Sequence, residues 1–386
     1  MQAQGGGGSI PAVQRRTRIQ SLLVSNRVRL LLLVPLLSTG LLSLHGTMVQ
    51  AQAPATPQVG FTFRPYTAAA LGLDPDTALT TLLTEIRPDV VRLPVYWSDV
   101  APSPTALDFT LPDDLVNRVV EYDARTPSRR ATIVLVVGMR NVGAPELYAP
   151  VWALNAVGGK FATALAKLPS YDAYLDATVH HYAGNPLLQR WQVENEPLDN
   201  SVPASEGDTM RSVADISAEV AEVRSLDPGH PVMTTTFTSS ALELDQEEIA
   251  QADYDVTPPA GPQPGGHPEE ALGLGNTLGL DLYVVYAGVD LSDADAATRI
   301  IWKRNSLGFW VQRAAQRNKN VWIAEMQAAP WQNVDGFTTD ELVMSAREYR
   351  DQGESTVLLW GVEQWLTSPP WLAAGKQAVA VLRGKA

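Results

Sequence analysis

The chain has 386 residues, 45% of them hydrophobic, so it can bury a large core and is far too apolar to be disordered. Its 29 Lys and Arg against 42 Asp and Glu give a formal net charge of −13. This acidity argues against nucleic acid or an anionic membrane surface as the main partner and favours a neutral substrate. The absence of cysteine excludes disulfides, thiolate metal sites and a cysteine nucleophile.

The first 53 residues differ in composition from the rest of the chain. They hold five arginines and no acid, followed by an apolar run at residues 30–44 and small residues up to Ala53. This pattern is typical of a secretory signal with cleavage after Ala53, and an uncleaved membrane anchor is the alternative. We expect residues 1–53 to be a signal peptide or anchor with a basic extension, and the protein to be secreted or associated with the cell envelope.

From residue 58 onward, short apolar runs rich in β-branched residues alternate with stretches of helical periodicity. This alternation predicts an α/β fold with a parallel sheet. The eight runs that we interpret as strands lie at 58–63, 90–97, 131–138, 190–196, 231–237, 278–286, 320–325 and 355–361. Eight strand–helix pairs match one (β/α)8 barrel, which would occupy residues 54–386 and leave no room for a second domain.

Helix signals are clear in two places between these runs. Apolar residues spaced by three and four form one predicted helical stripe at Met210, Val213, Ile216, Val220 and Val223. Farther on, Thr338 followed by Glu341 predicts a capping box, with Phe337 and Leu342 placed to form a hydrophobic staple.

Two connections are longer than packing requires, at residues 139–169 and 238–277. In a barrel both would lie at the carboxyl ends of the strands, where active sites are built. We expect the first connection to border a cleft. The second contains a turn-rich Pro and Gly stretch and is equally consistent with a surface insertion.

Polar residues occur where the apolar strands end, and in a barrel these ends meet at one face. They are Arg92 in the second strand, Asn195 and Glu196 at the end of the fourth, Asp281 and Tyr283 in the sixth, Glu325 at the end of the seventh and Trp360 at the end of the eighth. Strands four and seven lie on opposite sides of an eight-stranded barrel, so Glu196 and Glu325 should face each other. Two opposed carboxyl groups suit glycosidic-bond cleavage, with Arg92 as a cation that keeps one of them ionised.

These residues resemble the pattern of clan A of the glycoside hydrolases, retaining (β/α)8 enzymes that include family 5 cellulases and mannanases. The resemblance covers nearly all of residues 58–375. It implies Glu196 as acid/base and Glu325 as nucleophile. It further implies that Asn195 bonds the sugar 2-hydroxyl, that Arg92 and Tyr283 orient the nucleophile, and that Trp360 floors the sugar ring.

The segment "WQVENEPLDN" places a second carboxylate, Glu194, two residues before Glu196. An extended strand would put both on one face. We interpret Glu194 as a supporting group paired with a cation such as Arg190 or Arg140. Tyr286 competes with Tyr283 for the tyrosine role.

Tryptophans suit carbohydrate binding, because an indole face can stack on a pyranose ring. Trp97 and Trp331 directly follow strand ends and are the predicted sugar-stacking platforms. Five histidines without metal-ligand spacing predict no metal requirement, and no cofactor is expected.

The sequence therefore predicts a retaining β-glycosidase that hydrolyses a β-linked oligo- or polysaccharide by double displacement. A transglycosylase with the same covalent intermediate is one alternative. A catalytically silent barrel that binds a glycan at the cell surface is the other. The sugar, the linkage and the oligomeric state are not encoded in these patterns.

Overall fold

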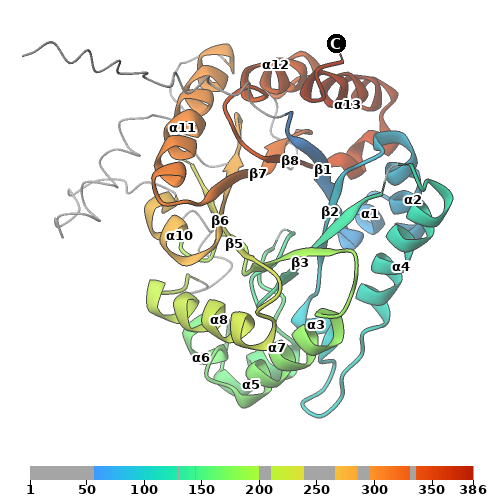
Figure 1. Cartoon of the computed structure of the whole chain (residues 1–386). Helices are drawn as coiled ribbons and strands as arrows, with labels where there is room; N and C mark the ends of the chain where they lie inside the picture. The colour runs from blue at the N-terminus through green and yellow to red at the C-terminus, as the bar shows by residue number, and fades with distance from the viewer. Residues whose placement is uncertain are drawn as a thin grey trace, which may run out of the picture. The chain divides into compact units, whose positions relative to one another are not determined.

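The computed structural model describes residues 56–128, 130–143, 145–199, 210–238, 266–285, 296–330 and 336–385. Eight parallel strands pair in chain order and close into a barrel, with the last strand beside the first (Figure 1). The strands are β1 (Gln58–Thr62), β2 (Val90–Pro94), β3 (Thr132–Val137), β4 (Leu188–Val193), β5 (Val232–Phe237), β6 (Thr277–Leu282), β7 (Asn320–Gln327) and β8 (Thr356–Trp360). The (β/α)8 prediction and all eight strands are confirmed, whereas the expected signal segment, residues 1–53, lies outside the described residues.

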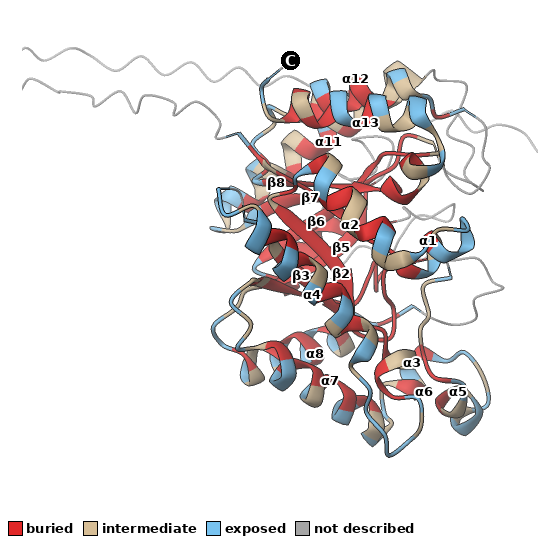
Figure 2. Cartoon of the chain, turned by 90° about the vertical axis from the view of Figure 1, so that its right-hand side faces the viewer, coloured by how far each residue is buried: buried red, intermediate tan, exposed pale blue. Residues whose placement is uncertain are grey.

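Helices surround the barrel and turn their buried faces toward it (Figures 1 and 2). Those of the first half are α1 (Pro65–Ala70), α2 (Pro75–Ile86), α3 (Trp97–Val100), α4 (Thr110–Arg125), α5 (Val151–Val157), α6 (Ala162–Leu165) and α7 (Pro169–Tyr182). Those of the second half are α8 (Val213–Leu226), α10 (Pro268–Leu274), α11 (Ala296–Gln316), α12 (Thr339–Tyr349), the 3-10 helix η2 (Val362–Thr367) and α13 (Pro369–Leu382). Among the described residues, no helix is long and apolar enough to span a bilayer.

Most strand residues are apolar and buried, as is expected of parallel strands covered by helices. In β3 every residue from Ile133 to Val137 is completely buried. Burying one large aliphatic side chain contributes about 1.5–3 kcal/mol, so these runs stabilise the barrel strongly. The barrel interior holds one compact apolar cluster of Val90, Val134, Met233, Trp322, Ala324 and Leu358.

Two helix predictions can be compared with the structure. Thr338 caps α12 and forms the full capping box with Glu341, as predicted. In α8 the stripe is correct only in part: the helix begins at Val213, and Met210 lies before it and is half exposed. Ser212 caps α8 by accepting from the Asp215 N–H, which fixes the helix start after Met210.

Candidate active site

The segment after β4 does not continue the strand. The strand ends at Val193, and Glu194 and Glu196 both have left-handed backbone conformations, with φ of 59° and 43°. The expectation that the two glutamates share one strand face is therefore wrong, because period-2 alternation stops at Val193. A non-glycine residue in this region costs about 1–3 kcal/mol, and such strain is typical of functional sites.

Glu194 is fully buried and bound on several sides. Its Oε1 accepts from the Tyr171 hydroxyl (2.9 Å) and pairs with Arg211 (2.8 Å), while Oε2 accepts from the backbone N–H of Arg140 (2.5 Å). Glu194 pairs with a cation as expected, but the cation is Arg211 and not one of the two that were named. Arg140 contributes only its backbone N–H, and Arg190 stacks on the Trp322 ring at 3.9 Å inside the barrel.

Gly138, directly after β3, is required by the position of Glu194. Its φ of 119° disfavours any side chain, and a Cβ at this position would lie 2.6 Å from the carboxyl carbon of Glu194. The glycine thus lets the Glu194 carboxylate pack against the neighbouring strand end.

Glu325 lies in β7 and is almost completely buried. One carboxylate oxygen pairs with the Arg92 guanidinium and the other accepts from the Tyr283 hydroxyl. Both donors come from other strands of the barrel, β2 and the end of β6. The structure therefore brings together Arg92, Tyr283 and Glu325, three of the residues expected at the site.

Arg92 connects this carboxylate to the fourth strand. Its Nε donates to Thr62 (2.8 Å) and one terminal nitrogen donates to the Gln192 side-chain oxygen (3.0 Å). The Gln192 amide nitrogen in turn donates to the side-chain oxygen of Asn195 (3.0 Å). With its oxygen occupied, Asn195 is left with its amide NH2 as the group to donate to a ligand.

Glu196 stands in a different environment from Glu325. Its backbone N–H donates to the Thr235 hydroxyl (3.0 Å), which fixes the chain. Burial raises the pKa of its carboxyl group well above the usual value, and the negative charges of Glu146, Asp199, Asp281 and Glu325 add to the rise. Burial and these neighbouring acids, Glu325 among them, therefore favour the protonated form of Glu196.

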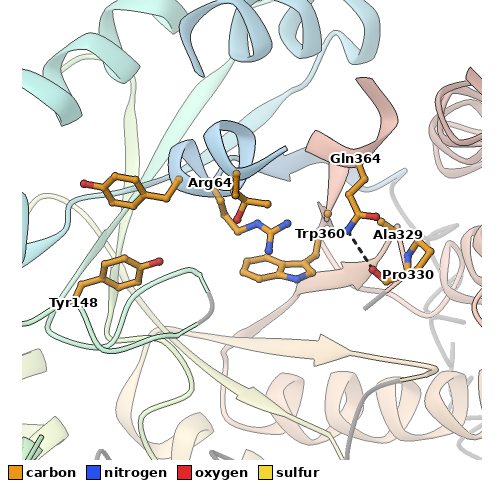
Figure 3. Close-up of a pocket in the computed structure, with 10 residues that line it drawn as sticks. Arg64, Tyr148, Ala329, Pro330, Trp360 and Gln364 are labelled. Carbon is orange, nitrogen blue, oxygen red and sulfur yellow. Dashed lines mark hydrogen bonds between the residues drawn. The ribbon is translucent and has the colours of Figure 1, made fainter. Parts of the chain in front are cut away.

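Trp360 ends β8 at the edge of a cavity of about 260 Å³. Figure 3 shows Arg64 lying over the indole, with its guanidinium carbon 4.2 Å from the ring centroid. Arg64 is held there by Glu363, which accepts from its backbone N–H (2.7 Å) and from its guanidinium (2.9 Å). Tyr148 lines the same cavity on the side of the 139–169 connection, as expected for a segment that borders a cleft (Figure 3).

Trp97, a predicted sugar-stacking residue, does not line this cavity. Trp97 is completely buried at the start of α3, where it packs against Trp152, Tyr171 and Tyr174. This packing leaves no indole face for a sugar, so the structure corrects the expectation for Trp97: it is a core residue. Trp331, and Tyr286 as the rival of Tyr283, lie outside the described residues.

Some residues of the site were not predicted. Arg64 lies two residues after the end of β1, so the rule that found Arg92 and Glu325, a polar residue at an apolar strand end, could have found it as well. Tyr66, Tyr96 and Tyr148 stack on one another beside the cavity, with ring centroids 5.4 Å (Tyr66–Tyr96) and 3.9 Å (Tyr96–Tyr148) apart. They come from three separate connections, and no spacing in the sequence indicates their contact.

Within the described ranges, no group of three or more His, Asp or Glu side chains is arranged to hold a metal ion. The chemistry available to the described site residues is thus that of carboxyl groups, an arginine, a tyrosine and amides. The Glu146 carboxylate pairs with the completely buried Arg140 at 2.5 Å, which adds a further cation–anion pair close to Glu196.

No protein-family model matches the sequence, and no curated protein matches it either. Solved structures do match the fold. A GH5_18 glycoside hydrolase from Streptomyces cattleya in complex with GlcNAc aligns with a TM-score of 0.59 and 13% identity, over 86% of this chain and 82% of that one. Endo-glycoceramidase II from Rhodococcus sp. aligns with a TM-score of 0.50 and 16% identity, over 80% of this chain and 74% of that one. An exo-beta-1,4-mannosidase from Opitutaceae bacterium strain TAV5 aligns with a TM-score of 0.52 and 16% identity, over 86% of this chain and 60% of that one. The expected likeness to family 5 glycoside hydrolases is confirmed at the level of the barrel.

Proposed function

We propose that this chain is a retaining β-glycosidase in which Glu325 is the nucleophile and Glu196 the acid/base. The observation that carries the proposal is the contrast between the two carboxyl groups. Glu325 receives a cation and a hydroxyl donor, whereas Glu196 is buried among other acids. A carboxylate bound by a cation and a buried carboxyl group that favours its proton are the pair that double displacement at a glycosidic bond requires.

In the first step, Glu325 attacks the anomeric carbon and forms a covalent glycosyl ester. At the same time Glu196 gives its proton to the glycosidic oxygen, so the leaving alcohol departs neutral. Arg92 and Tyr283 fix the two Glu325 oxygens and so determine the direction of attack.

In the second step, the charges on the two glutamates are exchanged. Glu325 is now a neutral ester, so one of the negative charges that raised the pKa of Glu196 is gone. The ionised Glu196 removes a proton from water, and the hydroxide attacks the anomeric carbon. Glu325 leaves as a carboxylate and Glu196 is protonated again.

Two further residues fit the sugar itself. The amide NH2 of Asn195 is the proposed donor to the 2-hydroxyl, since the Asn195 side-chain oxygen already accepts from Gln192. Trp360 is the proposed floor of the sugar ring, because it ends β8 at the cavity shown in Figure 3. A β-linked oligo- or polysaccharide is the proposed substrate.

A panel of aryl β-glycosides and of β-glucan, mannan, xylan and galactan polymers tests the proposal. We expect turnover of at least one, its loss in Glu325→Ala, and its recovery with azide as the glycosyl azide of inverted configuration. A wild-type product of inverted configuration would reject the retaining mechanism.

The two alternatives give different results in the same panel. A transglycosylase would transfer the sugar to an added glycan in preference to water. A silent glycan-binding barrel would turn over nothing, while binding a polymer equally well before and after Glu325→Ala.

We also propose that residues 1–53 direct export or anchor the chain to the envelope. Expression with this segment, followed by fractionation and N-terminal sequencing of the mature protein, checks this. A new terminus at Pro54 is expected for a signal cleaved after Ala53, and an intact chain in the membrane fraction for an anchor.

A further inference from the structure

Arg140 lies in the connection after β3 and binds three points of the segment that carries Glu196. Its backbone N–H donates to Oε2 of Glu194 (2.5 Å), and its backbone carbonyl accepts from the N–H of Asn195 (3.0 Å). Its guanidinium Nε donates to the carbonyl oxygen of Asn195 (3.0 Å). One residue thus holds both the N–H and the carbonyl group of Asn195.

The peptide group between Asn195 and Glu196 is bound on both sides. Arg140 Nε binds its carbonyl oxygen, and the Thr235 hydroxyl accepts from its N–H (3.0 Å). Because a peptide group is planar, fixing both of these atoms fixes the ψ angle of Asn195 and the φ angle of Glu196. This φ is 43°, a left-handed value that a non-glycine residue keeps only where surrounding contacts impose it.

Glu146 holds the guanidinium of Arg140 in this orientation. Its Oε2 pairs with Nη2 of Arg140 at 2.5 Å, with the Arg140 side chain completely buried and that of Glu146 19% exposed. A guanidinium is planar and rigid, so the anion on Nη2 determines where Nε points. The arginine therefore ties the 139–169 connection to the backbone of the Glu196 segment.

We propose that Arg140 is a positioning residue for the acid/base Glu196. By holding the Asn195–Glu196 peptide, it directs the Glu196 carboxyl group toward the glycosidic oxygen. This inference rests on the proposed function for its catalytic consequence, whereas the binding of the peptide is a property of the free protein.

The two carboxyl groups of the site are thus positioned by different means. Arg92 and Tyr283 bind the carboxylate of Glu325 directly. Arg140 binds the backbone that carries Glu196. A change at Arg140 should therefore affect the steps that use Glu196 as acid or base and leave the attack by Glu325 intact.

The kinetic test is Arg140→Lys. Lysine keeps the charge and can still pair with Glu146, but it has no second donor at the position of Nε. We expect kcat/KM for a phenyl glycoside to fall about 10- to 100-fold, because the carboxyl group that protonates the leaving group is misplaced.

A dinitrophenyl glycoside separates positioning from general damage, because its leaving group needs no proton. In Arg140→Lys its kcat and KM should fall together and its kcat/KM should stay unchanged, since only the second step, hydrolysis of the ester, is slowed. Arg304→Met, which breaks a pair with Glu348 on the outer helices (2.7 Å), should leave both substrates unaffected. Equal losses on the two substrates, or wild-type kinetics in Arg140→Lys, would overturn the role.

Glu146→Asp tests the same contact without touching the arginine. It keeps the negative charge but shortens the side chain by one methylene, which draws the guanidinium away from the Asn195 carbonyl. We expect the same pattern as in Arg140→Lys with a smaller fall. Should Arg140→Lys fail to fold, a wild-type dependence on the leaving group in Glu146→Asp rejects the proposal.

A further measurement needs no substrate. Wild type, Arg140→Lys and Arg304→Met are labelled with 15N-glutamate, and amide hydrogen exchange is followed by NMR, with Glu196 assigned by the signal lost in Glu196→Gln. In Arg140→Lys the protection of the Glu196 amide should fall about tenfold or more, because the opposite side of its peptide is released. The Glu325 amide in β7 should be unchanged, as should both amides in Arg304→Met.

The measurements separate the two ways of being wrong. Reduced protection of the Glu196 amide in Arg140→Lys, with no turnover of any glycoside by the wild type, would uphold the positioning and reject the proposed function. Turnover by the wild type, with unchanged protection and unchanged kinetics in Arg140→Lys, would reject the positioning and leave the proposed function standing.

Discussion

The ends of β4 and β7 both present a glutamate to the barrel mouth, but they do so in opposite ways. Glu325 lies within β7, where Arg92 and Tyr283 each bind one of its carboxylate oxygens. Glu196 lies beyond the end of β4 on a left-handed backbone, where burial and neighbouring acids favour its neutral form. The comparison teaches that the role of a carboxyl group is set by its neighbours and not by the strand end that carries it.

The largest effect should come from removing each glutamate in turn. Glu325→Ala should abolish turnover of every substrate. In Glu196→Ala, kcat/KM should fall about 10²–10⁴-fold for substrates whose leaving group needs a proton, which is the usual contribution of a general acid. For dinitrophenyl glycosides kcat/KM should be unchanged. Steady-state kinetics over a series of leaving groups measure this. An equal loss on all leaving groups in Glu196→Ala would contradict the assignment.

Removing the cation from Glu325 should destabilise the fold. In Arg92→Met a buried carboxylate loses its partner, which costs about 3–5 kcal/mol of the free energy of unfolding. Urea unfolding measures the change. Arg118→Met breaks an exposed pair with Asp76 and serves as the control, with an expected loss of at most about 1 kcal/mol.

Removing the hydroxyl from Tyr283 should lower activity without disturbing the fold, because it takes one of the two donors from Glu325. A hydrogen bond to a charged group contributes about 1.5–3 kcal/mol, so Tyr283→Phe should lower kcat about 10- to 150-fold. Tyr182→Phe removes a hydroxyl that bonds Asp113 on the outer helices and should leave kcat unchanged. If the two variants lose activity equally, Tyr283 does not act through Glu325.

A smaller effect concerns a buried acid away from the mouth. Burial raises the pKa of Glu354 to about 8, above its value in the unfolded chain, so the folded protein holds this proton more firmly. The resulting stability is complete below about pH 4 and is lost as the pH rises through 8. Calorimetry should show Tm falling over this range, and Glu354→Gln should reduce the accompanying loss of unfolding free energy by about 1–2 kcal/mol. An unchanged slope would contradict the burial effect; Glu121→Gln, on the exposed face of α4, is the control.

Much of the barrel could be predicted because its signals are local. Most of the strands are predominantly apolar runs. The polar residues Arg92, Tyr283 and Glu325 lie together because parallel strands bring their carboxyl ends to one face. The capping box of Thr338 is likewise a contact between residues three apart.

The incorrect and missing predictions involve contacts that the chain makes at long range. Trp97 follows a strand end, yet Tyr171 and Tyr174 of α7 bury it. The cation for Glu194 is Arg211, which the backbone turn after Val193 brings within reach. The place of Asp281 opposite Glu325 depends on a shift of register between β6 and β7, which no local pattern encodes.

Gly138 connects these observations to the tolerance of the chain for mutation. A side chain there would displace the Glu194 carboxylate, and with it the strained turn that carries Glu196. A saturation library selected for activity should therefore retain glycine at position 138 almost as strictly as it retains the two glutamates. Gly138 does not itself bind substrate in this proposal, so selection for activity should act on more positions of the sequence than the residues that contact the sugar.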